Sequence, residues 1–173
     1  AFDYAKGANW PTLGNFLPRA LFAGGPSSDV IDYLNIATLG NAADFGNLSA
    51  ASAKVKAVAS RTRAVFGGGS EGNGVDRIEF VEINTLGNVT DFGDLVVARG
   101  IHAGMGNSTR GIFAGGYATP SDTPTHYDEI DYITIASAGD ATDFGNLSAS
   151  RRELVGLASA TRGVVGSGKG SDD

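Results

Sequence analysis

One unit of sequence recurs along this chain: three copies are present and a fourth begins. Every copy opens with an arginine that is followed by a short apolar run and a pair of small residues, and these arginines are Arg19, Arg63, Arg110 and Arg162. The last glycine of this first block always lies 6 positions after the arginine. A second block starts with isoleucine, and the next arginine always follows 32 positions later. A repeat of such fixed length restricts the fold to architectures in which equivalent units pack side by side.

Length variation is confined to one stretch of the unit, between the glycine pair and the isoleucine. This stretch has 5 residues in the first copy (26–30), 8 in the second (70–77) and 13 in the third (117–129). Surface loops accept such changes in length, whereas packed strands do not. We therefore expect variable loops on one face of a rigid scaffold. The chain divides into an N-terminal segment and four units, at residues 1–18, 19–62, 63–109, 110–161 and 162–173.

The blocks predict short β-strands that are covered on both faces. They are rich in Val, Ile, Phe and Tyr and are bounded by Gly, Asn, Asp and Ser, which is typical of strands joined by tight turns. In the third copy, Ile130 and Tyr132 point to one side of the strand, and Ile133 and Ile135 point to the other. Apolar groups on both faces indicate a sheet that lies between two neighbours.

Residues 49–59 are rich in alanine and have helical propensity. Their counterparts in the other copies, at 100–107 and 152–159, contain too many glycines for a stable helix. We therefore expect strand here as well, which gives about four strands for each unit and an all-β chain.

Composition excludes several classes of protein. The chain has 173 residues and 42% apolar residues, enough for a core, and its 26 glycines follow no three-residue period, which excludes collagen. It contains no cysteine, which excludes a disulfide framework. A net charge of −6 argues against a nucleic-acid partner, and apolar runs of only a few residues argue against a membrane span, so we expect a soluble protein. Residues 1–17 do not have the pattern of a signal peptide.

The blocks together resemble kelch repeats, the units of one class of β-propeller. The likeness rests on an apolar strand that ends in Gly-Gly, a variable loop, an Ile-Asp-Tyr strand and an aromatic residue before a turn, and it covers residues 19–168. Phe45, Phe92 and Phe144 stand where kelch repeats usually have tryptophan. The resemblance implies kelch-like blades of four antiparallel strands, about three blades plus the first strand of a fourth.

The motifs Thr-Arg-Gly-Ile-Phe-Ala-Gly-Gly at 109–116 and Ile-Asp-Tyr-Ile-Thr-Ile-Ala at 130–136 also resemble repeats of phage and marine microbial proteins of tail or virion-structural type. That likeness implies a non-enzymatic structural or interaction protein of a virion or an extracellular assembly. Propellers close with 4 to 8 blades, so either this chain is a piece of a longer protein, or several copies complete a ring or fibre, or the repeats close differently. Three units of four strands also fit a β-trefoil or a β-prism, the folds of a carbohydrate-binding, lectin-like domain.

Three sets of recurring residues are predicted to have structural roles. The arginines (Arg63, Arg110 and Arg162, with Arg19) and the acids of the second block (Asp32 and Asp131, with Glu79) are expected to pair between neighbouring strands or blades and fix their register. A binding ring around the axis is the functional alternative. The glycines Gly25, Gly69 and Gly116 are expected where backbones approach closely.

The segments that contain Asp-Phe-Gly place Asn or Asp at three-residue steps. Asx-turns, with glycine at positive φ, are the favoured interpretation. Calcium binding is the alternative, because such a segment offers three oxygen side chains and backbone carbonyls. His102 and His126 fall in different elements and have no cluster of ligands with metal spacing, so no metal and no cofactor is predicted. No carboxylate pair or activated nucleophile stands out, and we expect no enzyme activity.

The longest variable loop is the best candidate for binding. It carries Tyr117, Asp122, His126 and Tyr127 together with two prolines. Aromatic rings on a stiff backbone form contact surfaces at low entropic cost. Protein partners or self-assembly are the expected use of this loop, and a glycan is the alternative ligand.

Overall fold

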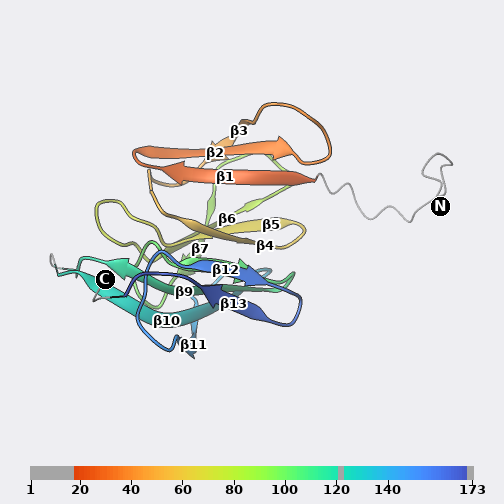
Figure 1. Cartoon of the computed structure of the whole chain (residues 1–173). Helices are drawn as coiled ribbons and strands as arrows, with labels where there is room; N and C mark the ends of the chain where they lie inside the picture. Colours follow the sequence, from red (N-terminus) through yellow and green to blue (C-terminus); the bar gives the residue numbers. More distant parts are fainter. Residues whose placement is uncertain (1–17, 121–122, 171–173) are drawn as a thin grey trace.

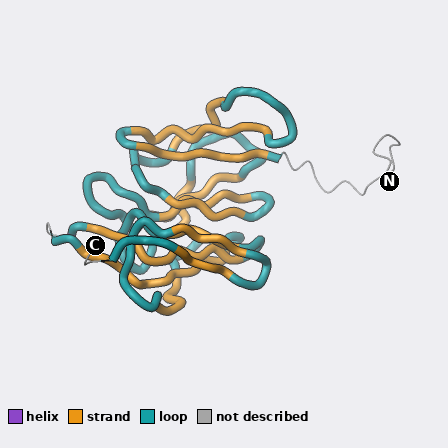
Figure 2. Tube along the Cα trace, viewed as in Figure 1, coloured by secondary structure: helices purple, strands orange, loops and turns teal. Residues whose placement is uncertain are grey.

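In the computed structural model, the elements of the described residues are β-strands (Figure 1), and loops join the strands (Figure 2). The structure describes residues 18–120 and 123–170, and in these ranges no helix is present that could cross a membrane. In chain order the strands are β1 (Arg19–Gly25), β2 (Ser28–Asn35), β3 (Ala43–Asn47), β4 (Lys56–Ala59), β5 (Arg63–Gly67), β6 (Arg77–Glu82), β7 (Thr90–Asp94), β8 (Ala103–Gly106), β9 (Arg110–Ala118), β10 (Thr125–Thr134), β11 (Thr142–Asn146), β12 (Val155–Ala158) and β13 (Gly163–Gly166). The prediction of an all-β chain is confirmed for the described residues. Of residues 49–59, which were predicted to be strand, 56–59 form β4, whereas 49–55 form the connector before it and are neither strand nor helix.

The strands form four antiparallel sheets, each built from consecutive strands. Sheet 1 has the order β1-β2-β3, sheet 2 β4-β5-β6-β7, sheet 3 β8-β9-β10-β11, and sheet 4 β12-β13. Sheets 2 and 3 begin with the strand that precedes the recurring arginine, so each sheet starts one strand earlier than the unit counted from that arginine. The predicted segment 1–18 lies outside the described residues apart from Pro18, as do residues 171–173 of the fourth unit.

Sheets 1, 2 and 3 are stacked face to face in chain order (Figure 1), and sheet 4 packs against sheet 3. A hydrophobic core lies between each pair of neighbouring sheets. Phe66 of sheet 2 packs with Ile31 and Phe45 of sheet 1. Phe113 of sheet 3 packs with Val65 and other residues of sheet 2. Burying one such phenylalanine stabilises the fold by about 1.5–3 kcal/mol.

Sheet 3 packs on sheet 2 across one face and on sheet 4 across part of the other, as the apolar groups on both sides of the strand predicted. Ile133 and Ile135 belong to the core shared with sheet 2. Ile130, on the opposite face of β10, packs beside the core shared with sheet 4. The smaller third core is built around Ala103, Met105 and Leu154.

The Asp-Phe-Gly segments are strands, and the prediction of Asx-turns was wrong for most of their length. They form β3, β7 and β11, and each contains a β-bulge at the phenylalanine, where the register with the preceding strand shifts by one residue. An Asx-turn bond remains at Asp143, whose Oδ1 accepts a hydrogen bond of 2.9 Å from the Gly145 amide. The sequence suggested a turn because Asp, Gly and Asn are turn residues, but the same residues form a bulge when a neighbouring strand supplies pairing partners.

The bulge glycines lie where the next repeat comes closest. Gly46 and Gly93 have φ values of 153° and 144°. A Cβ built on Gly46 would lie 2.2 Å from the carbonyl oxygen of Gly87, and one on Gly93 would lie 2.6 Å from that of Gly139. Only glycine fits so close to a neighbouring backbone.

Neighbouring sheets are also joined by hydrogen bonds along this edge. The amide of Gly87 donates to the carbonyl of Phe45 at 2.9 Å, and the amide of Gly139 donates to that of Phe92 at 2.6 Å. The side-chain oxygen of Asn88 accepts from the amide of Asn47 at 3.0 Å, as Asp140 does from Asp94 at 3.2 Å. Two of the oxygen side chains that suggested calcium, those of Asn88 and Asp140, thus serve contacts between repeats.

Three of the four recurring arginines stack on aromatic rings and do not pair with the recurring acids as expected. The guanidinium carbons of Arg19, Arg63 and Arg110 lie 4.6, 4.1 and 4.5 Å from the ring centres of Tyr33, Phe80 and Tyr132. Stacking leaves the planar guanidinium free to donate elsewhere. Arg19 donates to the carbonyl of Ile83 at 2.7 Å, and Arg63 donates to that of Ile135 at 3.1 Å, one sheet further along in each case.

The acids of the second block instead hold the connecting segment of the preceding sheet. Glu79 accepts a hydrogen bond from the amide of Ser49, and Asp131 accepts one of 3.1 Å from the amide of Val96. Their arginine partners are Arg77 and Arg99, which do not belong to the recurring set. Asp32 occupies the equivalent position in sheet 1 and is exposed.

Candidate functional site

The three variable segments emerge at one end of the stacked sheets. They join the strand that starts with the recurring arginine to the next strand of the same sheet, as the β1–β2 turn, the β5–β6 loop and the β9–β10 loop. Because the strands are antiparallel, the connectors between successive sheets, at residues 48–55, 95–102 and 147–154, reach the same end. We call these loops and connectors the loop end.

The glycine pairs hold the loops against the connectors. The amides of Gly25, Gly69 and Gly116 donate to the carbonyls of Ser52, Arg99 and Arg151 at 3.1, 3.0 and 2.8 Å. The same bond therefore recurs in all three copies, although the loops that follow differ in length. These bonds attach each variable loop to a fixed point of the scaffold.

The third variable segment is mostly strand, and its description as a 13-residue loop was wrong. β9 continues to Ala118 and β10 begins at Thr125, so Tyr117 pairs with His126, and Gly116 pairs with Tyr127. The extra residues lengthen a hairpin, because Tyr, Thr and His on both sides favour pairing. Of the predicted binding residues, Tyr117, His126 and Tyr127 lie in these two strands, and Asp122 lies outside the described residues.

Tyr117 is the centre of a small aromatic and cationic cluster. Its ring lies edge-on to His126, with 5.2 Å between ring centres, and the guanidinium of Arg152 lies 4.8 Å from its centre. Its backbone bonds in both directions with Gly100 of the connector. Burial raises the pKa of the Tyr127 hydroxyl above its usual value, and the charge of Glu129 adds to this shift. The cluster offers one ring face with a positive group beside it.

Two open depressions lie between successive variable loops. One has a volume of about 530 Å³ and lies between the β1–β2 turn and the β5–β6 loop, next to Ala53. The other, of about 120 Å³, lies between the β5–β6 loop and the β9–β10 hairpin and is lined by Tyr117. Lys54, Ser70 and Gly72 line both. Each loop therefore forms a wall of a depression with its neighbour.

Sequence reasoning missed two residues of this surface. Lys54 is exposed, has φ of 61° and lies between the two depressions. Asn73 joins two loops: its side chain donates to the carbonyl of Thr119 at 2.9 Å and accepts from its amide at 2.7 Å. The Gly-Asn-Gly sequence around Asn73 is a turn signal, but it gives no sign of a partner 46 residues away.

A buried polar cluster lies directly under the loop end. Arg99 and Asp131 form a salt bridge of 2.9 Å and are both fully buried. Burial raises the pKa of Asp131, and the positive charge of Arg99 opposes this shift. His102 is fully buried against Phe113, and burial together with the charges of Arg99 and Lys56 lowers its pKa to about 3. This cluster fixes one connector to sheet 3 and is not accessible to a ligand.

The described part of the chain has no group of three or more His, Asp or Glu side chains that could hold a metal ion. Comparison with known proteins found neither a family model nor a curated protein that matches the chain.

Proposed function

We propose that the chain is a non-enzymatic interaction module, a segment of a kelch-like β-propeller that binds a protein partner through the loop end. The sheets would be its blades, in a row of two complete blades flanked by two incomplete ones. A virion, in its tail or fibre, or an extracellular assembly is the proposed setting, which rests on the resemblance of the repeats described above.

One observation carries this proposal: loops of unequal length and composition emerge together from a scaffold that is otherwise the same in each copy. The repeated bonds of Gly25, Gly69 and Gly116 hold the scaffold constant. The depressions between the loops, which share Lys54, supply concave surface of mixed character. Binding residues are commonly found on loops that a rigid framework positions.

A peptide library displayed on phage and selected on the immobilised chain tests the proposal. We expect the selected peptides to lose at least tenfold in affinity when Lys54→Glu or Tyr117→Ser is introduced. Leu86→Ser is the matched control, because Leu86 is exposed in the β6–β7 loop at the opposite end. Selected peptides that bind the two loop-end variants as well as the unchanged chain would contradict the proposal.

A carbohydrate ligand is the second candidate, and the cluster around Tyr117 favours it. An exposed part of an aromatic ring with Arg152 stacked on it could pack against the apolar face of a sugar. A glycan array decides between the candidates. Selective binding that is lost in Tyr117→Ser would support the carbohydrate ligand over the protein partner.

A further inference from the structure

The two ends of the row of sheets expose apolar residues that are buried at equivalent positions inside it. Phe144 of sheet 3 is 55% exposed, whereas Phe92, its equivalent in sheet 2, is 3% exposed because sheet 3 covers it. Phe22 of sheet 1 is 57% exposed, whereas its equivalent Phe113 is fully buried against sheet 2. Ile36 of sheet 1 is also exposed, and its equivalent Ile135 is buried.

The exposed faces are the two halves of one interface. The face of sheet 3 around Phe144 is equivalent to the face of sheet 2 that receives sheet 3. The face of sheet 1 around Phe22 is equivalent to the face of sheet 3 that packs on sheet 2. The molecule forms this interface twice within itself, between sheets 1 and 2 and between sheets 2 and 3. We call the two uncovered halves the sheet 3 face and the sheet 1 face.

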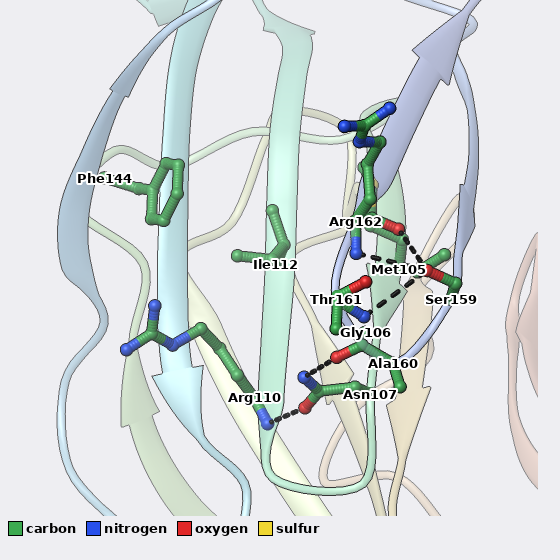
Figure 3. A pocket seen from close by; sticks show the side chains of 12 residues that line it. Met105, Gly106, Asn107, Arg110, Ile112, Phe144, Ser159, Ala160, Thr161 and Arg162 are labelled. Atoms are coloured by element: carbon green, nitrogen blue, oxygen red, sulfur yellow. Dashed lines mark hydrogen bonds between the residues drawn. The ribbon is translucent and has the colours of Figure 1, made fainter.

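On the sheet 3 face a pocket of about 180 Å³ marks the uncovered area. It is lined by Arg110, Ile112 and Phe144 on one side and by the turn from Ser159 to Arg162 on the other (Figure 3). Figure 3 shows the side chains of Arg110 and Phe144 beside neighbouring strands, apart from that turn. Sheet 4, with only two strands, leaves this part of sheet 3 uncovered.

The polar contacts of the internal interfaces specify partners for both faces. Arg19 and Arg63 donate to the carbonyls of Ile83 and Ile135 in the next sheet. By the same spacing, Arg110 of the sheet 3 face would donate to the carbonyl of Ile36 on the sheet 1 face. The chemistry of the two faces is therefore complementary in its hydrogen bonds as well as in its apolar residues.

The edge contacts extend the same pattern. Phe45 and Phe92 accept hydrogen bonds from the amides of Gly87 and Gly139, and the equivalent pair is the carbonyl of Phe144 and the amide of Gly40. The bulge glycine of sheet 3 is Gly145, and nothing lies within 4 Å of a Cβ built on it. The space that a neighbouring repeat occupies at the other two bulges is thus open at the third.

Within residues 18–120 and 123–170, the two incomplete sheets lack different strands: sheet 1 lacks the first strand of a four-stranded sheet, and sheet 4 lacks the last two. Among the described residues, sheet 1 has no strand beside β1 at the position that β4 and β8 take in sheets 2 and 3. Sheet 4 has the strand of that kind, β12, and in the described part of the chain no strand pairs with the other side of β13. β13 has only four residues, three of them exposed, and it is equivalent to the seven-residue β1.

We propose that two copies of this chain associate head to tail, with sheet 1 of one copy packed on the sheet 3 face of the other. The incoming β1 takes the place of β13 beside β12, which completes a sheet of four strands from one strand of one copy and three of the other. This inference rests on the propeller geometry of the proposed function.

The geometry points to a closed dimer. Each copy contributes its sheets 2 and 3 and shares in two completed sheets, so two copies make about six sheets in a ring, within the range of 4 to 8 at which propellers close, whereas three copies would make about nine. A head-to-tail contact that closes gives a ring, and one that does not close gives a filament.

Light scattering of the full chain, with single variants of each face, tests the association. We expect a mass twice the 17.6 kDa of one chain. Phe144→Asp and Ile36→Asp, each at an exposed position, should raise the dissociation constant at least tenfold. Leu86→Asp is the matched control, since this exposed leucine lies in a loop away from both faces, and it should leave the dimer unchanged. A monomeric chain, or an association that all three variants leave intact, overturns the inference.

Engineered cysteines test the closed arrangement, because the chain has no cysteine of its own. Ala42 and Asn146 are equivalent to Val89 and Asn47, which are joined by a backbone hydrogen bond of 3.0 Å. Ala42 directly precedes β3 and Asn146 ends β11, and these two strands lie at opposite ends of the molecule (Figure 1). In the double variant Ala42→Cys with Asn146→Cys we expect a disulfide-linked dimer on oxidation. Monomers that keep free thiols, or a ladder of larger polymers, contradict the closed dimer.

Failure of this inference can be told apart from failure of the proposed function. A monomer whose loop end still binds the selected peptides would overturn the dimer and leave the interaction module in place. A dimer whose loop end binds no peptide would support the association and contradict the proposed function.

Discussion

Burial of His102 makes the stability of the fold depend on pH. Its pKa is about 3 in the folded chain, against about 6.5 in an unfolded chain, so between these values only the unfolded state binds the proton. The free energy of unfolding should therefore fall as the pH is lowered from 6.5 toward 3, by up to about 1 kcal/mol per pH unit, and it should not change above pH 7 on this account.

The variant His102→Phe isolates this effect, because it keeps a ring against Phe113 and cannot be protonated. Between pH 7 and pH 5 we expect the unchanged chain to lose about 2 kcal/mol more than the variant, as measured by urea unfolding. The raised pKa of Asp131 acts in the opposite direction in both proteins and cancels in the comparison. Equal slopes in the two proteins would show that His102 is solvated in the folded state.

At the scale of the element, the β-bulge decides how closely two repeats approach. Gly93 and Gly145 occupy the same bulge position with similar φ values of 144° and 133°, so replacement by alanine strains both backbones alike. Only at Gly93 would the new Cβ also meet the next repeat, 2.5 Å from the carbonyl carbon of Gly139. We expect Gly93→Ala to cost about 1–3 kcal/mol more than Gly145→Ala.

Thermal or urea unfolding at concentrations where the chain is monomeric measures this difference. Equal destabilisation by the two substitutions would mean that backbone strain alone determines the cost. A shift of the next repeat away from Gly93 would show as an altered environment at Asp140 in spectra of the variant.

The sequence predicted the β-strands well, because the spacing of the repeats and the alternation of apolar side chains both depend on how the strands pack. Fixed spacing around Arg63 and Arg110 identified a rigid unit, and the alternation in Ile130–Ile135 identified a strand with two covered faces. It failed at the Asp-Phe-Gly segments, because a bulge and a turn use the same residue types and only the neighbouring strand decides between them.

Contacts between repeats were the other limit of sequence reasoning. The pairing of arginines with acids seemed natural from charge, but Arg63 stacks on Phe80 and donates to a carbonyl one sheet away. At the candidate site, Lys54 and its equivalent Ile101 both have positive φ, at 61° and 58°, and neither residue type signals that conformation. Such features depend on the arrangement of repeats in space, which a linear pattern does not contain.

At the scale of the whole molecule, the stacking of sheets predicts a gradient of local stability. Sheets 2 and 3 are packed on both faces, whereas sheet 4 has two short strands with Val155, Leu157 and Val164 exposed. In proteins built from stacked units, end units open more easily than central ones. We expect hydrogen exchange to be slowest in β5, β6 and β9 and fastest in β12 and β13.

Hydrogen exchange followed by mass spectrometry of the monomeric chain measures this gradient. Uniform protection from β1 to β13 would contradict it and would indicate that the chain opens as one cooperative unit. Phe144→Asp, which we expect to weaken the proposed association, is the suitable background for the measurement.

The offset between sheets and sequence units has a consequence for how such a chain can change in length. Each repeat ends with a strand that belongs to the following sheet, as β4 and β8 do. If the gene gains or loses one whole copy, the contacts between repeats are therefore kept, because the last strand of each repeat still pairs in the sheet of the repeat that follows it. Recombination could lengthen or shorten a protein of this design and so change how many distinct loops it displays, while the backbone around them stays the same.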